Sequence, residues 1–318
     1  MDISEREAAA SAPLSSPSLV GILPGLLLTM RPKQWTKNLL VFFALFFTID
    51  EHWDPSVPAI MANLVIRTFL AFVLFSMISG AVYIVNDILD VDKDRAHPKK
   101  RFRPIPSGRV PVSLALAAAV IISVASVALS FLLAMEFAWV ALGYLVLMFS
   151  YSLWLKHVVL LDVFAISAGF VLRAVAGAAV LQVPISPWLY TCTGLGALLI
   201  ALAKRRSELV AAGEGASKQR QTLEMYTPHL LDQFIAIVAP STLLAYTLYT
   251  FTASNLPANH AMMLTIPFVV YGLFRYLYLV HARGVGENPE DIIITDKPLI
   301  ISVVLWLGTA AAVLAVFR

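Results

Sequence analysis

The chain has 318 residues, of which 59% are apolar and only 14% charged, and its mean hydropathy is +0.80. A water-soluble protein of this size cannot bury so large an apolar fraction, so the composition excludes a soluble globule and predicts a protein embedded in a bilayer. The formal net charge of +3 is small and gives no indication of nucleic-acid binding.

Residues 1–17 are rich in Ala and Ser and begin with acidic side chains. A secretory signal would be basic there, so a disordered cytosolic tail is predicted instead. Residues 18–30 contain Pro24 and Gly25 and are short for a span, which indicates an entry helix lying in the membrane interface. All residues from 18–318 are expected to form one transmembrane domain.

Nine apolar stretches are long enough, or nearly so, to cross about 30 Å of hydrocarbon as helices. An all-α bundle of nine transmembrane helices is therefore expected. The first stretch is the weakest, because its unbroken apolar run extends only from Leu39 to Ile49. The expected spans are 34–50, 57–86, 110–135, 137–155, 158–183, 187–204, 230–253, 261–282 and 298–317.

Lys and Arg are distributed unevenly between the links that join these spans. The links on one side carry nearly all of them, including the run from Lys93 to Arg109, whereas the opposite links carry none. By the positive-inside rule the basic side is cytosolic. The prediction is a multi-pass protein of the plasma (inner) membrane with a cytosolic N-terminus and an external C-terminus.

An acidic cluster directly continues the second expected span, where residues 86–94 read N-D-I-L-D-V-D-K-D. On a helix the amide and three of the four carboxylates fall on one arc of about 100°. Such a group repels itself unless a cation lies within it, and oxygen-only ligands suit Mg²⁺. The predicted metal ligands are Asn86, Asp87, Asp90 and Asp94, and the three carboxylates are the predicted catalytic residues.

A basic loop follows the acids, because residues 97–109 contain three prolines and a glycine among their Lys and Arg side chains. Acids that hold a metal beside bases that hold phosphate oxygens suit a metal–diphosphate site at the membrane surface. The alternatives are a solvated acidic helix end and a basic anchor for lipid headgroups. Arg95, Lys99 and Arg103 are predicted to bind substrate.

The motif N-D-x-x-D-x-x-x-D followed by R-P-I-P-S-G resembles the UbiA-type superfamily of membrane prenyltransferases. R-P-K-Q-W-x-K-N at 31–38, Y-S-x-x-L-K-H at 151–157 and K-R-R-x-E at 204–208 resemble its decaprenyl-phosphate phosphoribosyltransferase branch. The resemblance covers nearly the whole chain. It implies nine helices around a cytosol-facing central cavity, with a diphosphate bound through Mg²⁺.

The same resemblance implies the reaction and the partners. The enzymes of this branch move 5-phosphoribose from phosphoribosyl diphosphate (PRPP) to a polyprenyl phosphate such as decaprenyl phosphate, releasing diphosphate, and the product feeds cell-wall arabinan synthesis. The expected partners are PRPP, the polyprenyl phosphate and the bilayer, without nucleic acid, and a homo-oligomer is compatible with the sequence. Prenyl transfer to an aromatic acceptor is the alternative reaction, and a transporter is the alternative class.

The sequence departs from the superfamily after the sixth span, where most members carry a second aspartate-rich motif. Here K-R-R-S-E at 204–208 retains one acid, and Lys204 and Glu208 are expected on one helix face. PRPP and a lipid phosphate together bring about six or seven negative charges, counting a terminal phosphate at about −1.5 to −2. Extra cations therefore favour phosphoribosyl transfer over aromatic prenylation.

Several further residues are candidates for substrate binding, each with a structural alternative. Lys33 and Lys37 are predicted to bind phosphate or to anchor topology, Lys156 to bind phosphate, and Asp162 to bind metal or ribose. Arg173 lies deep in its span, where it is functional or pairs within the bundle. The complete predicted substrate-binding set is Lys33, Lys37, Asn86, Arg95, Lys99, Arg103, Tyr151, Lys156, Asp162, Arg173, Lys204, Arg205 and Glu208.

The basic link at 204–229 is predicted to act as a mobile lid with a short helix near 217–225. Closing such a lid would exclude water from a reactive sugar cation.

Overall fold

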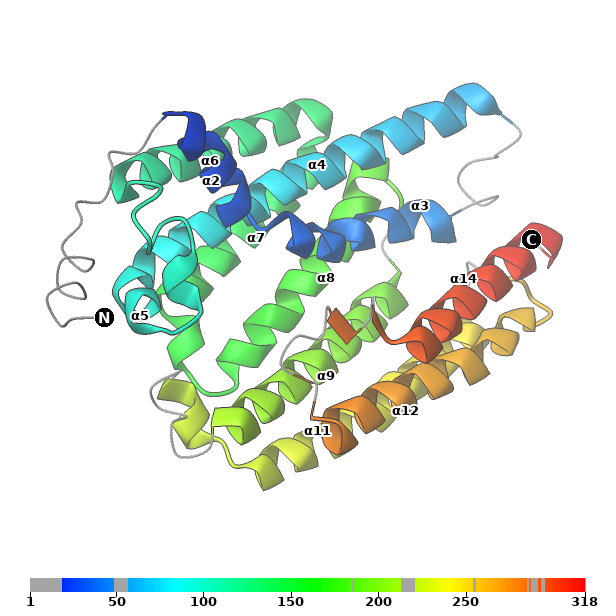
Figure 1. Ribbon diagram of the computed structural model, residues 1–318. Helices are drawn as coiled ribbons and strands as arrows, with labels where there is room; N and C mark the ends of the chain where they lie inside the picture. Colours follow the sequence, from blue (N-terminus) through cyan, green and yellow to red (C-terminus); the bar gives the residue numbers. More distant parts are fainter. Residues whose placement is uncertain are drawn as a thin grey trace, which may run out of the picture.

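The computed structural model describes residues 19–48, 57–184, 186–212, 221–253, 256–284, 286, 291–292 and 295–317. Its regular elements in these ranges are all helices, which confirms the all-α prediction (Figure 1). The predicted tail at 1–17 lies outside the described residues, as do residues 213–220 of the predicted lid at 204–229.

Within the described ranges, seven helices are long and apolar enough to cross a membrane, so the chain is a multi-pass membrane protein. Each of them corresponds to one of the nine expected spans. They are α4 (Pro58–Leu89), α6 (Val112–Leu133), α7 (Met135–Leu153), α8 (Leu161–Leu181), α11 (Pro228–Thr252), α12 (Ile266–Ala282) with the preceding 3-10 turn η6 (Ala261–Thr265), and α14 (Lys297–Phe317).

The other two expected spans differ from a simple apolar helix. The helix α9 (Pro187–Ala212) has 26 residues, but its last part carries the charged K-R-R-S-E motif. The expectation of one continuous α-helix over 34–50 is wrong for the described part of that range. It consists of an eleven-residue 3-10 helix, η1 (Pro32–Phe42), and a short α-helix, α3 (Phe43–Phe47). The total of nine spans stays a prediction.

The 3-10 conformation of η1 follows from what it packs against. A Cβ built on Gly177 of α8 would lie 2.1 Å from the carbonyl oxygen of Val41, so the backbones of α8 and η1 are in direct contact. The Asn38 side chain is buried and donates to Ser76 and Ser79 of α4. The hydropathy of this segment could not predict its 3-10 conformation, because the residues that it contacts are far away in the sequence.

The predicted interfacial helix corresponds to α2 (Leu19–Thr29), which contains Pro24. It leads into Met30, whose side chain fills the space over Gly80 of α4 and leaves no room there for a Cβ. Leu23 and Leu28 on α2 are exposed, as expected for a helix that lies against lipid.

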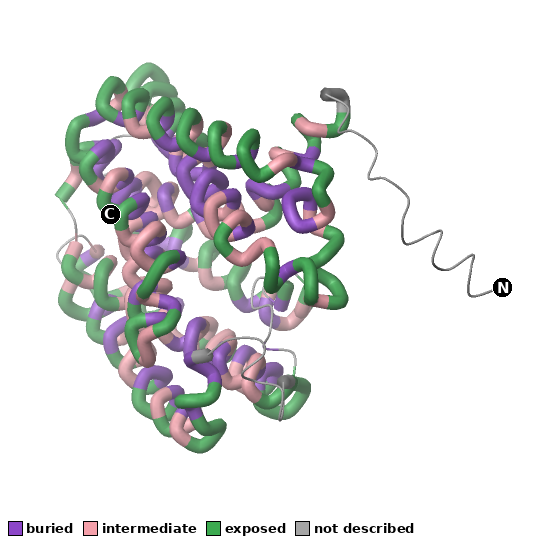
Figure 2. Tube along the Cα trace, turned by 90° about the vertical axis from the view of Figure 1, so that its left-hand side faces the viewer, coloured by how far each residue is buried: buried purple, intermediate pink, exposed green. Residues whose placement is uncertain are grey.

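Helix α8 lies at the centre of the bundle and separates two apolar clusters. One cluster joins α8 to α3, α4 and α7, and the other joins it to α9, α11, α12 and α14. Small residues including Gly169, Ala176 and Gly177 allow neighbouring helices to approach α8 closely. Figure 2 shows buried residues along the inner sides of the helices and exposed residues around the outside, where large apolar side chains such as Ile121 and Leu132 of α6 are available to lipid.

The contact between Gly177 and Val41 generates a stability prediction. Gly177→Val should destabilise the protein by about 1–3 kcal/mol or more, because the backbone of η1 has no room to move away from added methyl groups. Thermal unfolding of the purified protein in detergent measures this loss. Gly143→Ala is the matched control, since a Cβ there meets nothing within 4 Å; equal unfolding temperatures for the two variants would contradict the proposed contact.

Candidate active site

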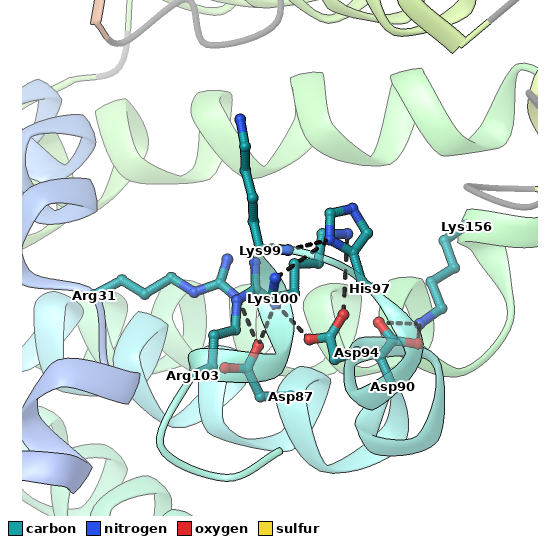
Figure 3. A network of polar contacts seen from close by, with 9 residues as sticks. All are labelled: Arg31, Asp87, Asp90, Asp94, His97, Lys99, Lys100, Arg103 and Lys156. Atoms are coloured by element: carbon teal, nitrogen blue, oxygen red, sulfur yellow. Dashed lines mark hydrogen bonds and ion pairs between the residues drawn. The ribbon is translucent and has the colours of Figure 1, made fainter. Parts of the chain in front are cut away.

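The acidic cluster lies where α4 ends and the short helix α5 (Val91–Ala96) begins. The backbone hydrogen bonds continue across this junction, from Asp90 to Asn86 at 3.0 Å and from Asp94 to Asp90 at 2.8 Å. Because the helical path is kept, the carboxylates of Asp87, Asp90 and Asp94 project from the same side (Figure 3). The predicted common face is therefore present.

Asp87 is the most buried of the three carboxylates, with 1% of its surface exposed. Its Oδ1 accepts hydrogen bonds from Arg31 Nη2 at 2.5 Å and from Arg103 Nη1 at 3.2 Å. The guanidinium of Arg31 also lies 4.8 Å above the ring of Tyr83. Asp87 thus orients two arginines and does not itself line the cavity described below.

The other two carboxylates have different cationic partners. Arg103 Nη1 donates to Asp94 Oδ2 at 2.6 Å, so this one guanidinium bridges Asp87 and Asp94. Lys156 Nζ lies 3.0 Å and 3.2 Å from the two oxygens of Asp90. It comes from the 3-10 turn η3 (Leu155–His157), which follows α7. Each carboxylate is therefore neutralised by a side chain from another part of the chain (Figure 3).

The basic loop after α5 is ordered, as predicted, and His97 contributes to its conformation. His97 Nδ1 accepts hydrogen bonds from the backbone nitrogens of Lys99 and Lys100, each at 3.2 Å. Burial and the neighbouring Lys100 ammonium lower the pKa of His97 below its ordinary value. The neutral imidazole is the form that can accept these hydrogen bonds.

A second polar cluster surrounds Arg205 near the end of α9. Its Nε donates to Asp162 Oδ2 at 2.8 Å, and its Nη1 contacts Glu208. Lys204 Nζ lies 4.0 Å from Glu208, as expected for two residues on one helix face.

Asp162 lies at the start of α8 and is completely buried. Its Oδ1 accepts from the Tyr226 hydroxyl at 2.8 Å, and that hydroxyl accepts from the backbone nitrogen of Leu160 at 2.8 Å. Burial raises the pKa of Tyr226 to about 12. Leu160 has φ of 68°, a conformation that L-residues rarely adopt. Asp162 therefore does not line the cavity, but its hydrogen bond orients the Arg205 guanidinium, which does.

Both polar clusters border one cavity of about 2190 Å³. Most of the predicted site residues line it, whereas Lys33, Asp87, Arg95 and Asp162 do not. Those that line it are Lys37, Asn86, Asp90, Asp94, Lys99, Arg103, Tyr151, Lys156, Arg173, Lys204, Arg205 and Glu208, and Arg31 and His97 join them although neither was predicted.

Much of the remaining cavity wall is apolar, with scattered hydroxyls such as those of Thr242 and Ser302. Its far part is lined by Phe47, Tyr249 and Trp306, and the Phe47 ring lies 6.3 Å from each of the other two rings. These residues are close to the start of α4 and the end of α11, whereas the charged clusters are at the opposite ends of those helices. The cavity thus has a polar end and an apolar end.

Arg173 lines the cavity between these two ends, but its hydrogen bonds are made within the bundle. Nε donates to Asn38 at 2.8 Å, Nη1 to the Gly169 carbonyl at 2.9 Å, and Nη2 to the Tyr144 hydroxyl at 2.7 Å. Its guanidinium also lies 5.2 Å above the Phe170 ring. These contacts match the structural alternative for this residue.

Two basic side chains of the sequence motifs point away from the cavity. Arg95 pairs with the exposed Asp92 at 3.3 Å. Arg206 pairs with Asp232 of α11, which also accepts from His281 at 3.1 Å.

The predicted magnesium site can be tested against the donor atoms present. Among the described residues, no three Asp, Glu, His or Cys side chains are close enough to share one metal ion. Asn86, Asp90 and Asp94 nevertheless line the polar end of the cavity, and every acceptor atom of their side chains is an oxygen, as a Mg²⁺ ligand should be. Mg²⁺ is usually held by one or two carboxylates together with waters and substrate phosphates, so these residues fit it without a closed protein cage.

The fold and this site define a membrane-embedded enzyme of the UbiA type. Residues 18–288 match the UbiA prenyltransferase family, and the chain belongs to that family. It is 33% identical over 302 residues to the decaprenyl-phosphate phosphoribosyltransferase of Mycolicibacterium smegmatis, covering 92% of each chain. It is also 33% identical over 289 residues to the protein of the same name from Corynebacterium glutamicum, covering 89% of this chain and 84% of that one.

A solved structure supports the fold independently. The structure of a UbiA homolog from Archaeoglobus fulgidus bound to DMAPP and Mg²⁺ matches with a TM-score of 0.67 and 17% identity, over 92% of this chain and 99% of the other. At this identity the likeness concerns the fold. The sequence relatives place the chain in the decaprenyl-phosphate phosphoribosyltransferase branch of the family.

The buried pair of Asp162 and Arg205 generates a second stability prediction. Asp162→Ala should destabilise the protein by about 3 kcal/mol or more, because it leaves a buried guanidinium with Glu208 as its remaining carboxylate. Asp232→Ala removes the carboxylate that pairs with Arg206. Because this pair is more exposed than the pair of Asp162 and Arg205, the loss of stability should be only about 0–1 kcal/mol. Thermal unfolding in detergent compares the two variants, and a larger loss for Asp232→Ala would contradict this ranking.

Proposed function

We propose that this protein transfers 5-phosphoribose from PRPP to a polyprenyl phosphate such as decaprenyl phosphate, with release of diphosphate. The observation that carries the proposal is the charge of the cavity. Among the described residues that line it, ten are Lys or Arg and three are Asp or Glu, an excess of seven positive charges. The two proposed substrates together bring about six or seven negative charges, so they match the cavity closely.

The relatives support the same reading. The names of the mycobacterial and corynebacterial proteins state a phosphoribosyl transfer to decaprenyl phosphate, and 33% identity extends over about nine tenths of the chain. The apolar end of the cavity offers a place for a hydrocarbon chain. By the same resemblance, the product class is a lipid-linked phosphoribose for arabinan precursors of the cell wall.

The proposed reaction is a substitution at the anomeric carbon of ribose. The bond from this carbon to the departing diphosphate breaks, and a bond forms to an oxygen of the lipid phosphate, which is already ionised at neutral pH. No strong general base is needed, so positioning and charge stabilisation supply most of the rate. In this proposal Arg103, Lys156 and Lys99, which line the polar end, would bind phosphate oxygens.

Asn86, Asp90 and Asp94 would hold Mg²⁺ in this proposal, and Asp87 would act by orienting Arg31 and Arg103. A bound Mg²⁺ supplies charge neutralisation for the leaving diphosphate. Asp162 would act on the substrate only through Arg205, whose side chain it holds.

We also propose the membrane arrangement that the distribution of charge predicts. In this arrangement residues 18–318 form one domain with nine spans, counting α9 and the η1–α3 segment. The polar end of the cavity faces the cytosol, where PRPP is made, and the C-terminus is external. The concentration of Lys and Arg at that end supports this orientation.

Prenyl transfer to an aromatic acceptor is the competing enzymatic function. It is favoured by the fold shared with a homolog that binds DMAPP. Purified protein supplied with labelled PRPP and decaprenyl phosphate should form a labelled lipid, and protein supplied with a prenyl diphosphate and 4-hydroxybenzoate should form no prenylated product. The reverse pattern would overturn the proposed function, and Mg²⁺-dependent turnover without vectorial transport would exclude a carrier.

Substitution of the carboxylates that face the cavity tests the metal assignment. Asp90→Ala and Asp94→Ala should each lower the rate of transfer at least about 100-fold, because the developing charge on diphosphate loses its counterion. Asp92→Ala is the matched control, since this carboxylate is 90% exposed and outside the cavity lining. Wild-type rates and unchanged Mg²⁺ dependence in the first two variants would refute the assignment.

A further inference from the structure

The stretch from Asn38 to Ala44 shows a period of three residues in its burial. Asn38, Val41 and Ala44 are buried, at spacings of three. A 3-10 helix has 3.0 residues per turn, so side chains three apart lie directly above one another. η1 therefore presents straight rows of side chains, where an α-helix would present rows that wind around its axis.

One of these rows lines the cavity along its whole length. Arg31, Gln34, Lys37, Leu40 and Phe43 all line the cavity, and each is three residues from the next. Gln34 and Phe43 are nine residues apart, which would place them on opposite sides of an α-helix at 100° per residue. Here the 3-10 repeat of η1 places Gln34, Lys37 and Leu40 on one side, and Phe43, the first residue of α3, continues that side along the cavity. Thr36 and Leu39 also line the cavity, and both are exposed.

The chemistry of this row changes halfway along it. Gln34 and Lys37 offer an amide and an ammonium, whereas Leu40 and Phe43 offer only apolar surface, and Phe47 continues that surface into the apolar end. At about 2.0 Å per residue, the row from Gln34 to Phe43 is about 18 Å long. An amphipathic molecule with a phosphate at one end and a hydrocarbon chain behind it matches this order.

The opposite row explains why η1 keeps this register. Asn38 Nδ2 donates to Ser76 at 3.0 Å and to Ser79 at 3.2 Å, and its Oδ1 accepts from Arg173 Nε at 2.8 Å. One turn on, the Val41 carbonyl packs against Gly177. In an α-helix, Asn38 and Val41 would be about 60° apart around the axis, so one of the two contacts would be lost.

We propose that Asn38 and Arg173 are positioning residues that hold η1 in its 3-10 register, so that the row Gln34–Lys37–Leu40–Phe43 binds the lipid phosphate acceptor. The phosphate lies at Gln34 and Lys37 and the isoprenoid chain lies along Leu40 and Phe43. This inference rests on the proposed function and deepens it, because it assigns one wall of the cavity to one of the two substrates.

PRPP does not match this row. It carries phosphate groups at both ends and needs cations at both, whereas the second half of the row is apolar. The acidic cluster and the loop cations Lys99 and Arg103, which also line the polar end, are left for PRPP.

The first test separates a positioning role from a purely structural one. Asn38→Leu keeps the volume and removes the hydrogen bonds, and it should raise the KM for decaprenyl phosphate at least 10-fold while the KM for PRPP changes less than 2-fold. Asn38→Asp keeps the acceptor for Arg173, and the Ser76 and Ser79 hydroxyls can donate to the new carboxylate in place of accepting from the amide, so this variant should restore the lipid KM to within about threefold of wild type. Equal changes in both KM values, or a lower unfolding temperature with both unchanged, would overturn the inference.

Ser123→Ala is the matched control for loss of a buried hydroxyl. Ser123 lies on α6 away from the cavity, and its Oγ has no hydrogen-bond partner among the described residues. Both KM values should stay at the wild-type level in this variant.

The second test needs neither turnover nor substitution of Asn38. In a Cys192→Ala background, each of Gln34→Cys, Lys37→Cys, Leu40→Cys and Phe43→Cys is reacted with a small maleimide, with and without decaprenyl phosphate. The lipid should protect all four positions, PRPP should protect neither Leu40→Cys nor Phe43→Cys, and Phe42→Cys should be unprotected because Phe42 packs on Phe72. Protection that stops after Lys37→Cys would overturn the inference.

The two tests also separate this inference from the proposed function. If decaprenyl phosphate protects the four introduced cysteines but the wild-type protein transfers no phosphoribose, the proposed function is refuted and the lipid-binding row is kept. A chain that transfers phosphoribose without protection at Leu40→Cys and Phe43→Cys would retain the function and refute the row.

Discussion

The burial of the Arg173 guanidinium inside the bundle is the constraint from which the cavity wall follows. A cation among transmembrane helices is tolerated only when its donors are satisfied. Arg173 meets this condition through Asn38, the Gly169 carbonyl and the Tyr144 hydroxyl, which belong to η1, α8 and α7. Satisfying one side chain therefore sets the relative positions of three elements that surround the cavity.

The polar end is assembled by charge in a similar way. Asp87, Asp90 and Asp94 come from one stretch of chain, but their partners come from the segment before η1, from the loop after α5 and from η3. The ion pair between Asp162 and Arg205 joins the start of α8 to the last part of α9. The Arg31–Asp87, Lys156–Asp90 and Arg205–Asp162 pairs join segments that are distant in sequence, so tertiary packing brings these charges together at the polar end of the cavity.

These cations also explain how the site differs from a metal cage. Three carboxylates that were all free to bind metal would repel one another, and here each is paired with a side chain of opposite charge. A phosphorylated ligand competes for the same guanidinium and ammonium groups. Under the proposed function, Asp90 and Asp94 would hold Mg²⁺, which would neutralise charge on the departing diphosphate.

The sequence by itself determined the properties that depend on neighbouring residues. Apolar runs predicted the seven spans that the structure confirms, because the bilayer sets the length of a helix without reference to its partners. The common side of Asp87, Asp90 and Asp94 and the pairing of Lys204 with Glu208 followed from helical spacing. The family motifs were likewise visible in short stretches of chain, and the match over 18–288 confirms them.

Only the tertiary structure decided which side of a helix faces the cavity and which partner each charge has. It turned Asp87 toward Arg31, placed Asp162 behind Arg205 with Tyr226, and drew η1 into a 3-10 helix against Gly177. The Arg31–Asp87, Arg205–Asp162 and Arg173–Asn38 hydrogen bonds join residues that are 56, 43 and 135 positions apart in the chain. Local periodicity carries no information about such partners, because only the packing of the bundle brings them into contact.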